Sequence, residues 1–203
     1  MSLTATRLLD AFSSNEPLPA GGSAAAMVGA IGTSVLMMVA TLPRTRTGAG
    51  DETTVLAAAA VRLRPVRDEL AALVDRDSES YAALLAAFRA PRATEEERTR
   101  RHEEIVAATR LATEVPLATM RASAAALNSA LVVAEHGSRS ASGDVAAAIE
   151  LLLGAIRAAG QSVAANLSAL KDEEYVERLE QERRRLEAES AAEVARVRDA
   201  LGD

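Results

Sequence analysis

Apolar residues recur every three or four positions along most of the chain, which is the period of an α-helix with one buried face. The pattern predicts a short helix, long helical segments and a charged helical tail, at residues 3–13, 23–42, 52–90, 94–135, 144–171 and 172–203. We find no alternating strand pattern and no repeat. The sequence therefore predicts an all-α fold, a bundle of long helices in a single domain. Residues 1–172 form the predicted helical domain, and residues 173–203 form a charged C-terminal helical extension.

Prolines and one capping sequence set the predicted helix boundaries. Pro91 ends one long helix, and Thr94 followed by Glu97 has the form of a capping box that opens the next. Pro65 and Pro116 fall inside two predicted helices, where a proline bends or kinks the chain.

The run from Pro17 to Leu42 carries no charged residue and is about as long as a membrane span. Its many glycines, alanines and hydroxyl residues make it less hydrophobic than a Leu- and Ile-rich span. Small residues at Ala25, Gly29 and Gly32 allow close helix contact. We interpret the run as a buried central helix, find no second candidate span, and expect no association with a membrane.

Composition narrows the function classes. Of 203 residues, 49% are hydrophobic and 26% are charged, as in ordinary globular proteins, and alanine is abundant. A net charge of −6 argues against a nucleic-acid surface. The lack of cysteine excludes disulfides and thiolate metal sites, and we expect no metal centre. The N-terminus has no signal-peptide pattern, so we expect a cytoplasmic protein.

Two polar residues occupy positions where the helical pattern calls for apolar ones. Asp77 lies in the middle of a face formed by Leu70, Leu73, Tyr81, Leu84 and Phe88. A carboxylate there is desolvated, paired or functional, unless helix rotation places it at the edge of the stripe in water. Asn166 lies on the apolar seam of the segment 144–171. It either fixes helix register as a buried amide or hydrogen-bonds a polar ligand.

Three further kinds of residue are weaker candidates. Asp144 opens a predicted helix, where it is either an N-cap or, if the helix end faces a cleft, a catalytic group. Lys171 is the only lysine among 23 basic residues, by chance or because an ammonium group is required. His102 and His136 accompany no serine or cysteine nucleophile motif, so we assign them no catalytic role.

The stretch Pro19-Ala20-Gly21-Gly22-Ser23 leads directly into a helix N-terminus. Free N–H groups and the helix dipole favour an anion or a carbonyl oxygen at such a position. The stretch is neither a dinucleotide fingerprint nor a P-loop, because no strand precedes it and no Gly-Lys-Ser/Thr follows. Gly21, Gly22 and Ser23 are therefore candidates for binding a ligand.

Several short motifs follow one another in order between residues 5 and 172: Pro19-Ala-Gly-Gly-Ser-Ala-Ala25, Asp77-Ser-Glu-Ser-Tyr81, Arg89-Ala-Pro-Arg92, Ala112-Thr-Glu-Val-Pro116, Asp144, and Asn166-Leu-Ser-Ala-Leu-Lys-Asp172. In order and spacing they resemble the cyclodeaminase/cyclohydrolase family. That family includes the C-terminal domain of formiminotransferase-cyclodeaminase and bacterial methenyltetrahydrofolate cyclohydrolases. The chain differs from the family pattern at Ala20, where the family has glycine, and at Ser162, where many members have asparagine.

The resemblance implies a one-carbon folate enzyme that acts on the N5/N10 bridge of tetrahydrofolate, with no cofactor beyond that substrate. We hypothesise that Asp77 and Asp144 supply the carboxylate that moves protons and stabilises the cationic bridge. The substrate-binding candidates are Gly21, Gly22, Ser23, Tyr81, Asn166 and Lys171, with Arg44, Arg46 and Arg92 for the glutamate tail. The resemblance also implies a homodimer or larger homo-oligomer. The alternative is a non-catalytic folate-binding or helical interaction protein of the same fold.

Overall fold

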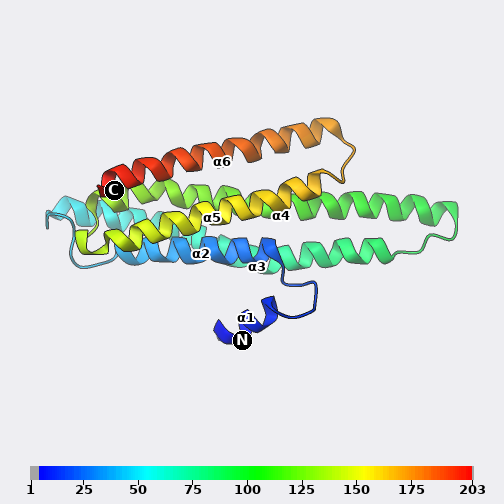
Figure 1. The fold of residues 1–203 in the computed structure, drawn as a ribbon, viewed down its shortest axis with the longest axis horizontal. Helices are drawn as coiled ribbons and strands as arrows, with labels where there is room; N and C mark the ends of the chain where they lie inside the picture. The colour runs from blue at the N-terminus through cyan, green and yellow to red at the C-terminus, as the bar shows by residue number, and fades with distance from the viewer. Residues whose placement is uncertain (1–4, 203) are drawn as a thin grey trace.

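The structure, a computed structural model that describes residues 5–202, consists of helices joined by short loops (Figure 1). The elements are α1 (Ala5–Phe12), α2 (Gly21–Ala40), α3 (Gly50–Arg89), α4 (Glu95–His136), the 3-10 turn η1 (Arg139–Ala141), α5 (Ser142–Leu167) and α6 (Glu173–Leu201). Within residues 5–202 no strand is present, only an isolated bridge between Thr45 and Gly137. The predicted all-α bundle is confirmed.

Each predicted segment corresponds to one helix, with boundaries shifted by a few residues. For example, α2 begins at Gly21 rather than residue 23, and α5 ends at Leu167 rather than residue 171. The predicted capping box opens α4, since the Thr94 side chain accepts from the Glu97 N–H and the Glu97 carboxylate accepts from the Thr94 N–H. Residues 3 and 4 of the first predicted helix lie outside the described residues.

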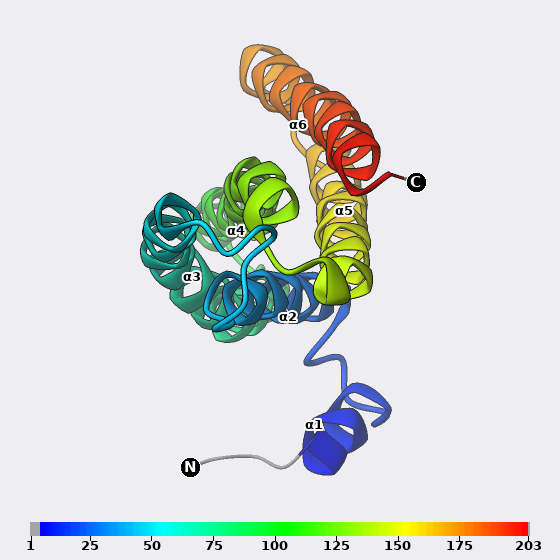
Figure 2. The ribbon, with the colours of Figure 1, turned by 90° about the vertical axis from the view of Figure 1, so that its left-hand side faces the viewer.

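Four long helices form the central bundle. Helix α2 lies against α3 and α5, and α4 lies against the same two helices (Figures 1 and 2). Large aliphatic side chains fill the centre, including the fully buried Leu36, Leu63, Leu117, Leu127, Ile149 and Ile156. A Cβ added at Gly32 would lie 3.0 Å from the Ala148 carbonyl oxygen, so the small residues of α2 do allow close contact with α5.

The charged tail folds back over α4 and α5 as helix α6 (Figure 1). Its buried Leu179, Leu186, Val194 and Val197 belong to the same hydrophobic cluster as the central helices. Ion pairs tie it down, among them Arg110–Asp172 at 2.6 Å, Arg121–Glu182 at 2.7 Å and Arg198–Glu150 at 2.6 Å. Residues 173–202 therefore pack as part of the bundle, and the predicted start of the C-terminal helical extension lies at the turn between α5 and α6.

The α3–α4 hairpin extends past the other helices (Figure 1). Along the predicted apolar face of α3, Leu70, Leu73 and Leu84 are buried, but Tyr81 is 37% exposed and Phe88 is 51% exposed. The prediction that both aromatic residues lie in the core is wrong. Helix α2 begins level with Asp77, so it does not cover the outer face of α3 beyond that point.

Two helices within residues 5–202 are long and apolar enough to cross a membrane. These are α2, with a mean hydropathy of 1.8, and α4, with 1.3; the second was not expected from the sequence. In both, more than half of the apolar window (56% and 61%) is buried inside the bundle, which is the pattern of core helices. The short helix α1 lies off the bundle on the side of α2 and buries none of its residues (Figure 2).

Candidate active site at the start of helix α2

A cavity of about 250 Å³ lies where α2 begins, between α3, α4 and α5. It is lined by Pro17, Ala20, Gly21, Gly22, Asp77, Ser80, Tyr81, Ala112, Ser162, Ala165 and Asn166. Five of the residues singled out in the sequence, Gly21, Gly22, Asp77, Tyr81 and Asn166, are therefore brought together. The glycine stretch, the Asp-x-x-x-Tyr segment and the end of α5 meet at this one place.

The N-terminus of α2 shapes one wall of the cavity. The N–H groups of Gly21, Gly22 and Ser23 have no acceptor within the helix, and the side chain of the N-cap residue Ala20 supplies none. The Ser23 N–H donates to the Asp77 carboxylate. The carboxylate of Asp77 on α3 approaches this turn, and the buried Ser23 hydroxyl lies 2.9 Å from its Oδ2. A Cβ at Gly22 would overlap the same carboxylate. Glycine is required at position 22 because the acid lies against the helix backbone.

Asp77 is a half-buried acid with one hydroxyl group beside it. Burial raises the pKa of its carboxyl above the ordinary value of 3.8, while hydrogen bonds from Ser23 lower the pKa in part. The Ser23 hydroxyl also lies 3.0 Å from the Val74 carbonyl and 3.1 Å from the Ser78 hydroxyl. With a single proton to donate, Ser23 can serve only one of these acceptors at a time. Asp77 therefore has the environment of a proton-transferring carboxylate.

Asn166 forms the opposite part of the lining. Its side-chain Nδ2 donates to the backbone carbonyl of Ala112 on α4, at 2.7 Å. The residue is half-buried, so the amide is held by the protein on one side and borders the cavity on the other. Asn166 thus links two helices and also lies within reach of a ligand.

Asp144 does not line this cavity. It is exposed, in the first turn of α5, and the N-cap of that helix is Ala141 rather than Asp144. Asn166 lies 22 residues further along the same helix, which corresponds to about 33 Å. Helices α2 and α5 run antiparallel, since Gly29 meets Ala155 and the later Gly32 meets the earlier Ala148. Asp144 therefore lies toward the end of α2 that is far from the cavity. The expectation that Asp77 and Asp144 share a cleft within one chain is wrong.

The arginines expected to bind a glutamate tail do not line the cavity either. Arg44 and Arg46 follow the C-terminus of α2, which places them at its far end. Arg46 is held there, since its Nη1 donates to the Ala134 carbonyl at 2.7 Å and its backbone N–H donates to His136. Arg92 lies in the loop at the tip of the α3–α4 hairpin. Arg44, Arg46 and Arg92 therefore do not line this cavity, and their binding of a glutamate tail stays a prediction.

Lys171 lies just after α5, at the same end of the bundle as Asn166, but it is exposed and is not among the cavity-lining residues.

Sequence reasoning did not assign several lining residues to the site, including Ser80, Ala112, Ser162 and Ala165. Ser80, Ala112 and Ser162 belong to the motifs and departures that carry the family resemblance, but no binding role was predicted for them. Three of these four lining residues are helical neighbours of residues that sequence reasoning identified. Ser80 is three positions after Asp77, and Ser162 and Ala165 precede Asn166 by four and one positions. The same three–four spacing that identifies a buried face would have pointed to Ser80 and Ser162.

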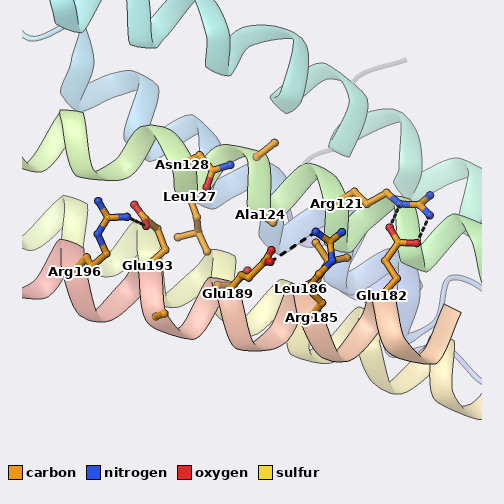
Figure 3. Close-up of a pocket in the computed structure, with 13 residues that line it drawn as sticks. Arg121, Ala124, Leu127, Asn128, Glu182, Arg185, Leu186, Glu189, Glu193 and Arg196 are labelled. Atoms are coloured by element: carbon orange, nitrogen blue, oxygen red, sulfur yellow. Dashed lines mark hydrogen bonds and ion pairs between the residues drawn. The ribbon is translucent and has the colours of Figure 1, made fainter. Parts of the chain in front are cut away.

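A larger groove of about 670 Å³ runs between α4 and α6, but its charges are already satisfied (Figure 3). Arg121 pairs with Glu182, Arg185 with Glu189, and Arg196 with Glu193. No acid in this groove resembles Asp77 in being buried without an arginine partner. The smaller cavity at the start of α2 is therefore the better candidate for chemistry. Within residues 5–202, no three His, Asp or Glu side chains gather in a way that would hold a metal ion.

Comparison with known proteins agrees with this geometry. The model of the formiminotransferase-cyclodeaminase family matches residues 4–185, which include every residue that lines the cavity. The chain belongs to the formiminotransferase-cyclodeaminase family. The match covers α1 to α5 and ends within α6, so it includes part of the predicted C-terminal helical extension.

Two curated members of this family are similar along much of the chain. Methenyltetrahydrofolate cyclohydrolase of Methylorubrum extorquens is 30% identical over 189 residues, which are 93% of this chain and 91% of that protein. Formimidoyltransferase-cyclodeaminase of Gallus gallus is 29% identical over 158 residues, which are 77% of this chain but only 29% of that longer protein.

A solved structure shows the same fold. The crystal structure of formiminotetrahydrofolate cyclodeaminase from Thermotoga maritima superimposes with a TM-score of 0.88, covering 98% of this chain and 96% of the other, at 22% identity. At that identity the likeness is evidence for the family's all-α fold, and the choice of substrate has to be argued from the site.

Proposed function

We propose that this protein is a one-carbon folate enzyme that acts on the N5/N10 bridge of tetrahydrofolate. The reaction favoured first is hydrolysis of the methenyl bridge, because the relative of that name is similar along almost the whole chain. The observation that carries the proposal is Asp77, a half-buried carboxylate at the start of α2, inside a cavity also lined by Tyr81 and Asn166. Removal of ammonia from a formimino group is the second candidate, favoured by the likeness to the Gallus gallus protein.

Both reactions pass through a tetrahedral carbon between two nitrogens. In the first, water attacks the cationic methenyl carbon, loses a proton, and one C–N bond opens to give a formyl group. In the second, N10 attacks the formimino carbon and ammonia leaves. A carboxylate beside that carbon stabilises the positive charge and accepts or returns the proton. Asp77 is placed to do this, and the free N–H groups of Gly21 and Gly22 are suited to a pterin carbonyl oxygen.

A turnover assay with both substrates tests the proposal. Purified protein is incubated with methenyltetrahydrofolate and, separately, with formiminotetrahydrofolate, and the absorbance of the methenyl group is followed. We expect the methenyl signal to decay faster than in buffer, or to grow from the formimino substrate. Binding of folates by calorimetry without any change in either signal would favour the non-catalytic alternative, and no binding would contradict both.

We further propose that the protein forms a homodimer through the outer face of α2. Met27, Ile31, Val35 and Met38 form an apolar surface there, with Ile31 47% exposed and Met38 41% exposed. No residue of α2 is charged, although the chain carries a net charge of −6. Two like-charged copies can approach most easily where neither carries charge, and an apolar face of this kind is typical of a homodimer contact.

Ile31→Glu tests this interface. We expect the variant to elute as a monomer in size-exclusion chromatography with light scattering, because a carboxylate would be desolvated at the dimer contact. Val61→Glu is the matched control, since Val61 is 71% exposed on α3 and lies outside this face. A wild-type protein that is monomeric at micromolar concentration would contradict the proposal. Cytoplasmic location and the lack of a cofactor beyond the folate stay predictions.

A further inference from the structure

The interior of helix α4 contains a backbone carbonyl that lacks its usual donor within the helix. In an α-helix the carbonyl of each residue accepts from the N–H four positions later. The residue four positions after Ala112 is Pro116, which has no N–H, although α4 continues through it from Glu95 to His136. Ala112 is only 5% exposed, so its carbonyl needs a partner from elsewhere in the protein.

Asn166 on α5 supplies that partner. Its Nδ2 donates to the Ala112 carbonyl at 2.7 Å. A carbonyl can only accept, so the amide must turn its nitrogen toward α4 and cannot flip without losing the bond. The Oδ1 atom is then left as an acceptor, and it receives no hydrogen bond from any residue in the described part of the chain. Asn166 lines the cavity that also contains Asp77.

We propose that Pro116 is a positioning residue, which fixes the Asn166 amide with Nδ2 on the Ala112 carbonyl, so that Oδ1 is directed away from that carbonyl and is available to a ligand in the cavity. The cavity then offers two acceptors, Oδ1 of Asn166 and the carboxylate of Asp77, to one ligand. Two acceptors select a ligand edge that carries N–H donors. This inference rests on the proposed function, in which the donor edge is the amino and ring N–H edge of the pterin.

Pro116→Ala removes the constraint without removing any group from the cavity. The new N–H can bond to the Ala112 carbonyl, which then no longer depends on Asn166 as its only donor, so the amide can rotate without leaving that buried carbonyl unsatisfied. We expect the dissociation constant for tetrahydrofolate to rise about tenfold, the worth of one well-oriented hydrogen bond. The melting temperature should stay the same or rise, because a proline in a helix interior is destabilising. A purely structural role for Pro116 would change the melting temperature and leave binding unaltered.

Pro65→Ala is the matched control. Pro65 also lies inside an uninterrupted helix, α3, and the carbonyl that it leaves free belongs to Val61, which is 71% exposed. Water can satisfy that carbonyl, and no side chain donates to it in residues 5–202. We expect Pro65→Ala to leave folate binding unchanged.

A double-mutant cycle decides whether Pro116 acts through Asn166. In the Asn166→Ala background, Pro116→Ala should no longer change the dissociation constant. An equal loss in both backgrounds, or no loss in the wild-type background, overturns the proposal.

Nuclear magnetic resonance of the Asn166 side-chain amide gives a readout that needs no folate. Its hydrogens should exchange slowly in the wild type and quickly in Pro116→Ala. If the wild type binds no folate, the proposed function fails, while slow exchange that is lost in Pro116→Ala still supports the positioning role. Equal exchange in the two proteins overturns it.

Discussion

Replacing Asp77 with asparagine is expected to lower turnover of the folate substrate by at least about 100-fold, the lower range for loss of a general acid or base. Asparagine keeps the shape of the side chain and can still accept from Ser23, so the fold should be retained. Its amide cannot carry a negative charge or accept a proton near neutral pH. The measurement is the initial rate of loss of methenyl absorbance, with circular dichroism as the check on folding.

Asp75→Asn is the matched control for this prediction. Asp75 lies on the same helix, two residues earlier, and is exposed. It should keep wild-type turnover. Full activity in Asp77→Asn would show that the reacting carboxylate is another residue. Asp144→Asn then becomes informative, because Asp144 can reach the cavity only if it comes from another copy of the chain.

The stability of Asp77→Asn should distinguish a catalytic carboxylate from a structural one. Burial raises the pKa of Asp77 above 3.8, so the folded protein holds this proton more tightly than the unfolded chain. The contribution of Asp77 to stability is therefore greatest at low pH and is lost as the pH rises through its folded pKa. At pH 7 the asparagine variant should melt at the same temperature as the wild type or higher, and the difference should shrink toward pH 3.8. A variant that melts well below the wild type at pH 7 would mean that the charged acid mainly holds α2 in place.

The sequence predicted those parts of the site that depend on local pattern. The three–four period identified Asp77 and Asn166 because each interrupts an apolar face, and the glycine stretch identified the start of α2. All three are properties of a single helix and its end. The cavity brings them together because α2 runs antiparallel to α5 and lies beside α3.

The errors concern how far apart helix ends lie in three dimensions. Asp144 and Asn166 belong to one helix, so a site that contains one cannot contain the other in the same chain. Tyr81 and Phe88 fit the apolar period of α3, yet they are exposed because α2 starts level with Asp77 and leaves the α3–α4 hairpin uncovered. The period of apolar residues shows which face of a helix is apolar. Whether the side chains on that face are buried depends on where the neighbouring helix begins.

The C-terminal helix combines a dense charge pattern with a buried stripe. The sequence predicts residues 173–203 as a charged helical extension, and in the structure Leu179, Leu186 and Val194 of α6 face the core. Several charged side chains form ion pairs within α6. Arg183, for example, pairs with Glu180 and Glu187. A dense charge pattern is therefore compatible with a buried stripe at helical spacing.

Gly22→Ala is expected to lower both stability and turnover. A methyl group at position 22 would overlap the Asp77 carboxylate, so the side chain or the start of α2 must move. Overpacking of this kind costs about 1–3 kcal/mol. A catalytic group displaced by about 1 Å can lose about 100-fold in rate. We expect a reduced free energy of unfolding in urea titrations, and turnover close to that of Asp77→Asn.

A glycine without such a neighbour provides the control. Gly154 lies inside α5, and a Cβ added there would meet nothing within 4 Å. Gly154→Ala should stabilise the protein by roughly 0.5–1 kcal/mol, because alanine is the better helix former, and should leave turnover unchanged.

The double variant Gly22→Ala/Asp77→Ala separates the two effects of the methyl group. Removing the carboxylate makes room for the methyl group, so the stability lost in Gly22→Ala should largely return, while turnover stays low. Stability losses that simply add would mean that the methyl group and the carboxylate do not compete for the same space. In that case glycine would be required at position 22 because a ligand approaches the first turn of α2. Gly22→Ala alone should then weaken folate binding. The pH dependence of turnover, which Asp77 sets, should stay unchanged.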